Sequence, residues 1–208
     1  MSKIFQVGLH RVRNGNIMDG IDELMGDERA DFIYSDPPWG QGNLRYWQTI
    51  NEQMTGAEPL SISYDEFLPF LFSQIKKYAK GKIVIEYGVK WNADIVQAVE
   101  KLGLIHHGST VCYYGSKSKP LPCDLHFIST GEPIHLTDEF KQKCTELWDL
   151  KLVKYIFEYL GIPNHGVCLD PMCGMGFTAQ AAKDRGLAFR GNEINMKRLQ
   201  KTIDRLEK

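Results

Sequence analysis

Short apolar runs alternate with longer amphipathic segments along this chain, and that alternation most constrains what it can fold into. The runs expected to form strands are Arg11–Arg13, Asp31–Ser35, Lys82–Tyr87, Ser109–Tyr113, Leu125–Ser129, Gly166–Asp170 and Leu187–Gly191. The segments expected to form helices are Ile17–Met25, Tyr64–Ala79, Asn92–Leu102, Cys144–Leu160, Thr178–Asp184 and Met196–Leu206. Strands separated by helices favour parallel pairing. The sequence therefore predicts an α/β fold with a mostly parallel sheet.

Two polar segments do not follow this alternation. Residues 40–63 are rich in Gly, Gln and Asn, and residues 115–124 join two expected strands. Segments of this length without structure of their own are uncommon inside a compact domain and often carry function. We therefore predict two long loops, both of them candidates for contact with a substrate.

The size and composition are those of one soluble domain. A chain of 208 residues, 43% hydrophobic and 25% charged, is long enough to bury a single core, so we expect residues 1–208 to form one domain. The sequence shows no signal-peptide pattern and no apolar run of membrane-spanning length, which predicts a cytoplasmic protein with no membrane partner. The five cysteines form no CxxC pair and the histidines have no metal-binding spacing, so we expect free thiols and no metal.

A glycine-rich turn joins an expected strand to an expected helix near the end of the chain. Strand Val167–Asp170 runs into Pro171–Gly176 (PMCGMG), and a helix led by Thr178 follows. Glycines in such a turn let the backbone approach a ligand, and the helix N-terminus offers free N–H groups. About twenty residues further on, Glu193 follows the next strand, where a carboxylate can accept both hydroxyls of a ribose. Together they predict a nucleoside site, although the incomplete GxGxxG pattern disfavours a dinucleotide.

The tetrapeptide Asp36-Pro37-Pro38-Trp39 is the most specific motif in the chain. It follows the expected strand Asp31–Ser35, at the carboxyl edge of the sheet, where α/β folds bind ligands. Its prolines rigidify the motif and offer no N–H group, so its polar atoms are mainly acceptors. Rigid acceptors beside the flat face of a tryptophan suit a planar group that carries an amine. The alternative interpretation is a proline-rich turn with a core tryptophan.

Together the two motifs resemble the amino-methyltransferases, which use S-adenosylmethionine to methylate exocyclic amines of nucleobases. Here the Asp-Pro-Pro-Trp tetrad comes first, and the turn that begins at Asp170, followed by Glu193, comes last. This order is similar to the circularly permuted, beta-class arrangement of the DNA enzymes. The resemblance implies a single Rossmann-like methyltransferase domain with a seven-stranded, mostly parallel sheet, helices on both faces, and S-adenosyl-L-methionine as cofactor. Enzymes of this class usually carry a target-recognition domain, and the remaining segments here are too short for a separate one.

The resemblance also implies roles for individual residues. The implied catalytic residues are Asp36, Pro37, Pro38 and Trp39. The implied cofactor contacts are Asn16, Lys151, Asp170, Pro171, Met172, Cys173, Gly174, Gly176, Thr178, Glu193 and Asn195. Asp36 and the Pro37 carbonyl would hold the target amine while Trp39 stacks on the base, and the methyl group would transfer directly. Asn16 stands where the family usually has an acid, and Met172 where it usually has Phe.

The substrate that the resemblance implies is DNA, and the Asp of the tetrad favours the N6 amine of adenine. Candidate substrate contacts are Arg45, Tyr46, Trp47, Lys117 and Lys119. Alternatively, the aromatic residues among them anchor a loop to the core and the lysines are solvated. A net charge of −1 gives little grip on a long duplex, so we expect short or flexible sites or a homodimer. Adenine methylation of RNA, N4 methylation of cytosine in DNA, and a non-catalytic cofactor-binding subunit are the open alternatives.

Overall fold

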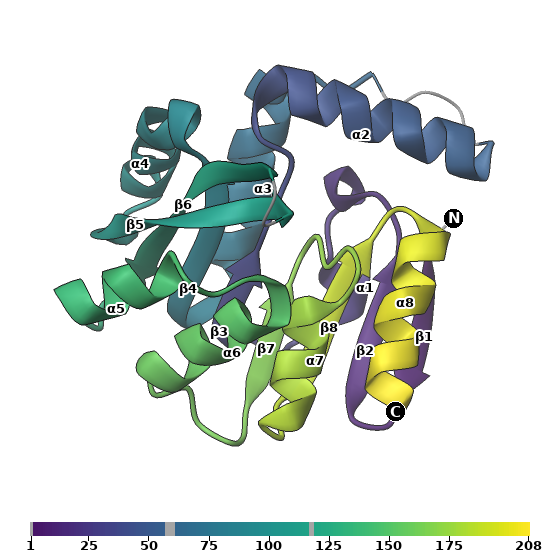
Figure 1. Cartoon of the computed structure of the whole chain (residues 1–208). Coiled ribbons are helices and arrows are strands. Elements are labelled where there is room, and N and C mark those ends of the chain that lie inside the picture. The colour runs from purple at the N-terminus through teal and green to yellow at the C-terminus, as the bar shows by residue number, and fades with distance from the viewer. Residues whose placement is uncertain (1, 57–60, 117–118) are drawn as a thin grey trace.

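A single sheet forms the centre of the molecule (Figure 1). The computed structural model describes residues 2–56, 61–116 and 119–208. Its strands are β1 (Lys3–Val7), β2 (His10–Asn14), β3 (Ala30–Ser35), β4 (Ala79–Gly88), β5 (Ile105–Ser116), β6 (Lys119–Ser129), β7 (Val167–Asp170) and β8 (Ala188–Glu193). They lie in the order β1-β2-β8-β7-β3-β4-β6-β5.

The middle of this sheet is parallel and its two edges are antiparallel. Neighbouring strands from β2 to β4 pair in parallel, whereas β6 is antiparallel to both β4 and β5, and β1 is antiparallel to β2. The predicted α/β fold with a mostly parallel sheet is confirmed. The predicted count of seven strands is wrong, because the described sheet has eight. The additional strand, β1, lies at an edge with mostly exposed side chains, so no buried apolar pattern marks it in the sequence.

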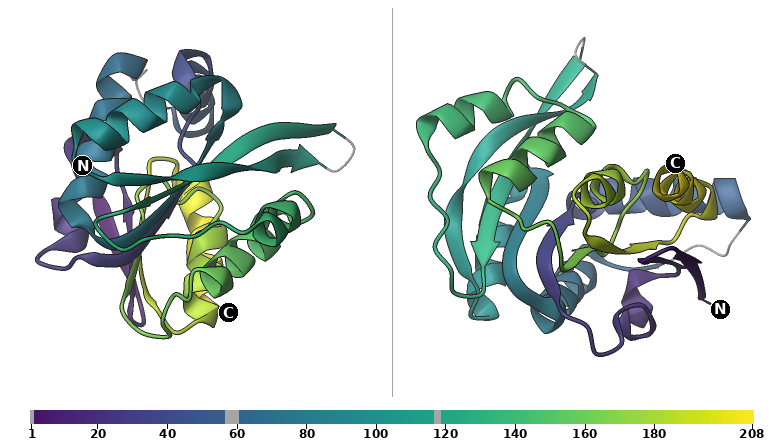
Figure 2. Two further views of the ribbon diagram at one scale, coloured as in Figure 1. Left: turned by 90° about the vertical axis from the view of Figure 1, so that its left-hand side faces the viewer. Right: turned by 90° about the horizontal axis from the view of Figure 1, so that it is seen from below.

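Helices cover both faces of the sheet. The helical elements are η1 (Ile17–Asp19), α1 (Asp22–Met25), α2 (Gly40–Thr55), α3 (Tyr64–Tyr78), η2 (Val89–Trp91), α4 (Asn92–Lys101), α5 (Asp138–Cys144), α6 (Asp149–Tyr159), α7 (Phe177–Asp184) and α8 (Met196–Glu207). Helices α6, α7 and α8 lie on one face, and α1 and α3 lie on the other (Figures 1 and 2). No helix in the described ranges is both long and apolar enough to cross a bilayer.

Helix α3 shows how the apolar pattern leads to structure. Its buried apolar side chains are Phe67, Leu68, Leu71, Phe72, Ile75 and Tyr78. Before the helix, the Ser63 hydroxyl accepts a hydrogen bond from the Glu66 amide, and the Glu66 carboxylate accepts one from the Ser63 amide at 3.1 Å. This capping box satisfies two amides that the first turn leaves without helical partners. The predicted helix over residues 64–79 is confirmed.

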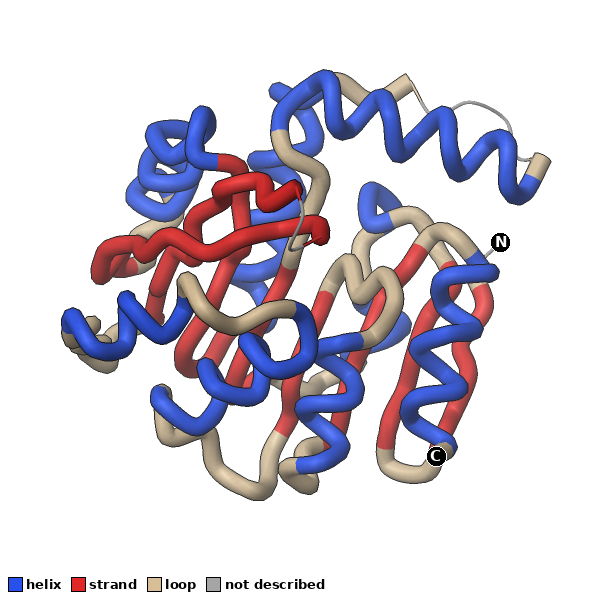
Figure 3. The backbone as a smooth tube through the Cα atoms, in the orientation of Figure 1, coloured by secondary structure: helices blue, strands red, loops and turns tan. Residues whose placement is uncertain are grey.

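Residues 40–55, predicted to be a loop, form helix α2. The buried residues of this helix are Gly40, Leu44 and Asn51. Because the rest of α2 is polar or partly exposed, no apolar stripe marks the helix in the sequence. Its first turn is held to α3 by the Gln41 side chain, whose oxygen accepts a hydrogen bond from the Tyr64 amide at 2.7 Å. Helix α2 consequently lies across the carboxyl edge of the sheet, above the loops that follow β3, β7 and β8 (Figure 3).

Three further predictions about elements are wrong. The single helix predicted over residues 17–25 is divided at Gly20 and Ile21 into η1 and α1. The helix predicted over residues 144–160 begins too early, because residues 145–148 are not helical and α6 begins at Asp149, whereas Cys144 is the last residue of the separate helix α5. Asp149 has φ = +47°, a left-handed conformation that Asp tolerates better than most residues. The predicted loop over residues 115–124 belongs, where it is described, to the hairpin of β5 and β6.

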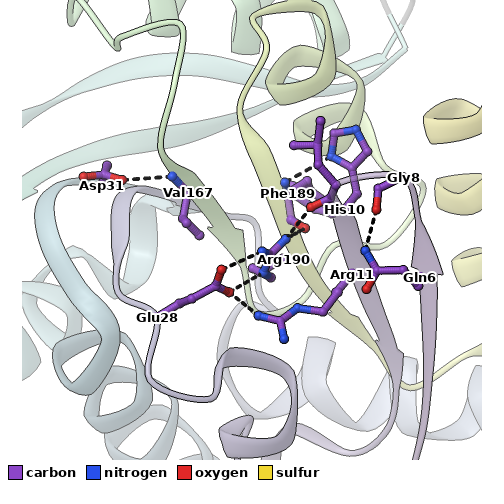
Figure 4. Close-up of polar contacts among 10 residues, drawn as sticks. Gln6, Gly8, His10, Arg11, Glu28, Asp31, Val167, Phe189 and Arg190 are labelled. Atoms are coloured by element: carbon purple, nitrogen blue, oxygen red, sulfur yellow. Dashed lines mark hydrogen bonds and ion pairs between the residues drawn. The ribbon is translucent and has the colours of Figure 1, made fainter.

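A network of charged side chains joins β2 and β8 to the segment that precedes β3 (Figure 4). The Arg190 guanidinium, which is buried on β8, donates two hydrogen bonds to the Glu28 carboxylate at 2.7 and 2.8 Å. Arg11 of β2 donates to the same carboxylate. These contacts lower the pKa of Glu28 below its usual value, chiefly through the Arg190 hydrogen bond. Glu28 therefore ties the segment before β3 to two strands of the sheet.

Glu28→Ala is expected to lower the free energy of unfolding by about 1–3 kcal/mol, because Arg190 would remain buried without its carboxylate partner. Urea denaturation at neutral pH measures the change. The control is Glu158→Ala, which removes an exposed carboxylate from α6. Equal losses of stability in the two variants would contradict the role assigned to this network.

Candidate active site

A cavity of about 250 Å³ lies at the carboxyl ends of β3, β7 and β8. The tetrad Asp36–Trp39, which follows β3, lines one side of it. Asp170, the glycine-rich turn and Glu193 line the other side. These segments are far apart in the sequence, and the parallel pairing of β3 with β7 and of β7 with β8 brings their carboxyl ends together. The two motifs found in the sequence therefore face one shared space.

The tetrad is held in place by one hydrogen bond within it and by others to neighbouring residues. The Trp39 indole N–H donates to Asp36 Oδ1 at 3.1 Å, and the Trp39 amide donates to Asn43 Oδ1 of α2 at 2.9 Å. The Pro38 carbonyl accepts a hydrogen bond from the Tyr87 hydroxyl at 2.9 Å. Trp39 thus orients Asp36 as well as offering an aromatic surface, a contact that the sequence did not indicate.

Glu86 on β4 is a second carboxyl group of this corner, and the sequence reasoning did not find it. One of its oxygens accepts a hydrogen bond from the Tyr34 hydroxyl at 2.9 Å, and the other accepts one from the buried Cys123 thiol at 3.5 Å. Burial raises the pKa of Glu86. Burial and then the charge of Glu86 raise the pKa of Asp36 well above its usual value. A polar residue within the apolar run Lys82–Tyr87 was the available signal.

Two main-chain amides, one from the turn after β7 and one from the segment after β8, bind the Glu193 carboxylate. Oε2 of Glu193 accepts a hydrogen bond from the Gly174 amide at 3.0 Å, and Oε1 accepts one from the Asn195 amide at 2.8 Å. Gly176 has φ = +82°, and a Cβ there would lie 2.8 Å from Thr202 Cα, so the close packing of this turn on α8 requires glycine. The carboxylate is consequently fixed at the boundary of the cavity.

Asp170 is a buried carboxyl group of the cavity whose pKa is strongly raised. Its Oδ1 accepts a hydrogen bond from the Met172 amide at 3.1 Å, and burial raises its pKa to about 7. Ionised Asp170 is therefore unfavourable in the cavity by itself, and a bound cation would stabilise it.

Asp170→Asn is expected to stabilise the protein without ligand at pH 8 by about 1–3 kcal/mol, because the buried charge is removed. Since the folded-state pKa is raised, Asp170 costs stability as pH rises from about 4 to about 7, and the cost is constant above that. The difference in free energy of unfolding between variant and wild type, measured by urea denaturation, should thus increase from about pH 4 to about pH 7. Asp27→Asn, at an exposed position, is the control and should show no such window. A constant difference from pH 4 to pH 8 would contradict the assignment.

Acidic side chains outnumber basic ones around the cavity. The carboxyl groups that line it are Asp36, Glu86, Asp149, Asp170 and Glu193. The basic residue among the lining residues is Arg198 of α8, whose guanidinium lies 4.1 Å from the centroid of the Trp47 ring on α2. A cavity lined in this way attracts a cationic ligand.

A second, apolar cavity adjoins the first beneath α2. Its apolar wall includes Ile17, Leu44, Ile62, Phe67 and Ile194. Its polar lining consists mainly of the side-chain amides of Asn16, Gln48, Asn51 and Asn192. Glu193 and Trp47 line both cavities. Neutral donors and acceptors on an apolar wall suit an uncharged, planar, hydrogen-bonding ring.

Most residues named from the sequence lie at these two cavities. The predicted residues that line the first are Asp36, Pro37, Pro38, Trp39, Trp47, Asp170, Met172, Cys173, Gly174, Gly176, Thr178, Glu193 and Asn195. Asn16 lines the second, where its side chain also accepts a hydrogen bond from the Met18 amide at 3.1 Å.

The other predicted residues lie elsewhere. Pro171 lines neither cavity, and its carbonyl accepts a hydrogen bond from Asn192 at 3.1 Å. Lys151 is exposed on α6 and does not line the cavity. Asp149, the first residue of the same helix, lines it. The exposed residues outside both cavities are Arg45, Tyr46 and Lys119. Lys117 lies outside the described residues.

Comparison with known proteins shows a shared fold. The sequence matches no protein-family model, and it matches no curated protein. The complex of M1.HpyAVI with S-adenosylmethionine superposes with a TM-score of 0.67 at 14% identity, over 95% of this chain and 98% of that chain. TTHA0409 of Thermus thermophilus, described as a putative DNA modification methylase, gives a TM-score of 0.65 at 18% identity, over 95% and 94%.

A third structure, the cytosine-N4-specific PvuII DNA methyltransferase, gives a TM-score of 0.61 at 12% identity, over 93% of this chain and 85% of that chain. TTHA0409 has also been solved with S-adenosyl-L-methionine. At such low identities these likenesses show that the chain has the fold of these proteins.

Proposed function

We propose that this chain is an S-adenosylmethionine-dependent DNA methyltransferase that modifies the exocyclic N6 amine of adenine. The observation that carries the proposal is that the acceptor corner at Asp36 and the glycine-rich turn at Gly174 line one cavity. A methyl donor and a target amine must come within bonding distance of each other, and a shared cavity meets this requirement. Of the proteins that share this fold, one is described as a DNA methyltransferase and another as a putative DNA modification methylase.

The linings of the two cavities suit the proposed cofactor in charge and in polarity. S-adenosylmethionine is a cationic methionine sulfonium joined through a ribose to a neutral adenine. The acidic cavity suits the cationic part, and the apolar cavity lined by side-chain amides suits the adenine. Glu193 lines both cavities, which is the position required of a carboxylate that accepts hydrogen bonds from the ribose hydroxyls. Two proteins of this fold have been solved with this cofactor.

In this proposal the residues of the chain position the amine and stabilise charge. Asp36 and the Pro37 carbonyl accept the two amine hydrogens, which favours a pyramidal nitrogen with an available lone pair. The Trp39 indole holds the Asp36 carboxylate in place from the other side. When bound, the cofactor would supply an electrophilic methyl group and leave as the neutral thioether S-adenosylhomocysteine, and the methylated amine would lose one proton to the Asp36 carboxylate, whose pKa is raised. As the nitrogen gains positive charge, the ionised, half-buried Asp36 stabilises it.

The proposed substrate is a base in DNA, and exposed residues near the cavity are candidates for contacts with the nucleic acid. A base in a duplex must leave the stack to enter a cavity of this kind. Arg45 and Tyr46 on α2 and Lys119 on the β5–β6 hairpin are exposed, and we propose that they contact the nucleic acid. The preference for adenine comes from the Asp of the tetrad, and a homodimer would enlarge the contact surface of a nearly neutral chain.

The test is transfer from isotope-labelled S-adenosylmethionine to matched duplex DNA, single-stranded DNA and RNA free of methylated bases. The products are identified by mass spectrometry of the nucleosides. We expect label in N6-methyladenine from DNA. Label in N4-methylcytosine would overturn the base assignment, and label in RNA alone would overturn the substrate. Cofactor binding without transfer to any of the three would favour a non-catalytic subunit.

A further inference from the structure

Asn51 on α2 has an unusual position for a carboxamide. Its side chain is 6% exposed and lines both the acidic and the apolar cavity. Among the described residues, its Oδ1 atom is buried with no hydrogen-bond partner. A buried acceptor without a partner loses its hydrogen bonds to water and gains none in return, so such groups are rare unless a ligand completes them.

The other side-chain amides of the apolar cavity are already engaged. Asn16 Oδ1 accepts a hydrogen bond from the Met18 amide at 3.1 Å. Asn192 accepts one from Arg13 at 2.8 Å, and Gln48 donates one to the Ile62 carbonyl at 3.3 Å. Among the described residues, Asn51 is therefore the member of this set with a buried acceptor atom that has no hydrogen-bond partner, so that acceptor is left for a ligand that enters the cavity.

The surroundings of Asn51 limit what that ligand can be. Leu44 and Trp47 lie one or two turns earlier on α2 and line the same cavity, and Phe67 lines it from α3. An apolar, partly aromatic wall around one unpaired acceptor suits a flat ring that carries a hydrogen-bond donor at its edge. A carboxamide is also the side chain whose donor and acceptor match the edge of adenine.

We infer that Asn51 reads the adenine ring of the cofactor, with Oδ1 accepting a hydrogen from the 6-amine. This inference rests on the proposed function, because it assumes an adenosyl cofactor. It assigns to α2 the recognition of the cofactor base, in addition to any contact of its exposed face with the substrate. Asn51 is then a specificity-determining residue, located in a helix that the sequence pattern does not reveal.

The test is a comparison of two ligands in two proteins by calorimetry. The ligands are S-adenosylhomocysteine and its analogue in which hydrogen replaces the 6-amine of the purine. We expect wild type to bind the analogue about tenfold or more weakly than S-adenosylhomocysteine. In Asn51→Leu the affinity for S-adenosylhomocysteine should fall by about tenfold to a hundredfold, and the two ligands should bind alike. Gln53→Leu, on the exposed face of the same helix, is the matched control and should behave as wild type.

Stability of the protein without ligand is the second readout. Since the Oδ1 atom has no partner among the described residues, Asn51→Leu should be at least as stable as wild type to urea. A merely structural role for Asn51 would make this variant less stable. Equal discrimination between the two ligands in wild type and Asn51→Leu would overturn the inference and leave cofactor binding intact. Failure of wild type to bind S-adenosylhomocysteine would instead overturn the proposed function.

Discussion

Replacing Asp36 with alanine is expected to reduce methyl transfer by about a hundredfold to ten-thousandfold, with a change of less than about threefold in cofactor affinity. The reason is that the contacts of Asp36 with the amine strengthen as the nitrogen becomes positive, so their loss raises the barrier more than it weakens binding. Single-turnover transfer to DNA measures the first quantity, and calorimetry with the cofactor measures the second. Asp65→Ala removes an exposed carboxylate of α3 and should leave both unchanged.

The pH dependence of transfer gives an independent check on Asp36. The carboxylate form accepts the amine hydrogen, and burial together with Glu86 raises the pKa of Asp36 in the protein without ligand. Transfer should therefore be lost as pH falls through this raised pKa, well above the value of about 3.9 of an ordinary aspartate. An acid limb at the ordinary aspartate value would contradict the environment described for Asp36.

Glu193→Ala is expected to weaken cofactor binding by about 1–3 kcal/mol, which is roughly a tenfold to hundredfold rise in the dissociation constant. The carboxylate is already oriented by the amides of Gly174 and Asn195, so it can accept two ribose hydroxyls without further ordering. Calorimetric titration with S-adenosylhomocysteine measures the loss. Transfer at saturating cofactor should change much less.

The matched control for this variant is Glu207→Ala, which removes an exposed carboxylate at the end of α8. It should bind the cofactor as wild type does. The two cavity variants are informative together, because they separate the two sides of the site. If Asp36→Ala lost cofactor affinity while Glu193→Ala lost only transfer, the assignment of the two sides would be reversed.

Agreement between sequence and structure is best where the signal is local. The run Lys82–Tyr87 and the periodic apolar positions of α3 act over a few residues, and both elements form as predicted. Helix α2 failed as a prediction because it buries few side chains and gains its packing from α3. The predicted start of the helix at Cys144 was wrong for a related reason. The left-handed conformation of Asp149 does not alter the spacing of apolar residues, so the sequence pattern does not reveal it.

By itself, the sequence determined the α/β class and the chemistry of two motifs, the rigid acceptors at Asp36–Trp39 and the glycine-rich turn that precedes Glu193. These properties follow from covalent stereochemistry and from the spacing of apolar residues along one chain segment. Only the tertiary structure decided that both motifs face one cavity and that Glu86 and Asn51 join them. Burial, unpaired acceptors and the influence of one carboxyl on another depend on distances between segments remote in the chain, and folding alone sets those distances.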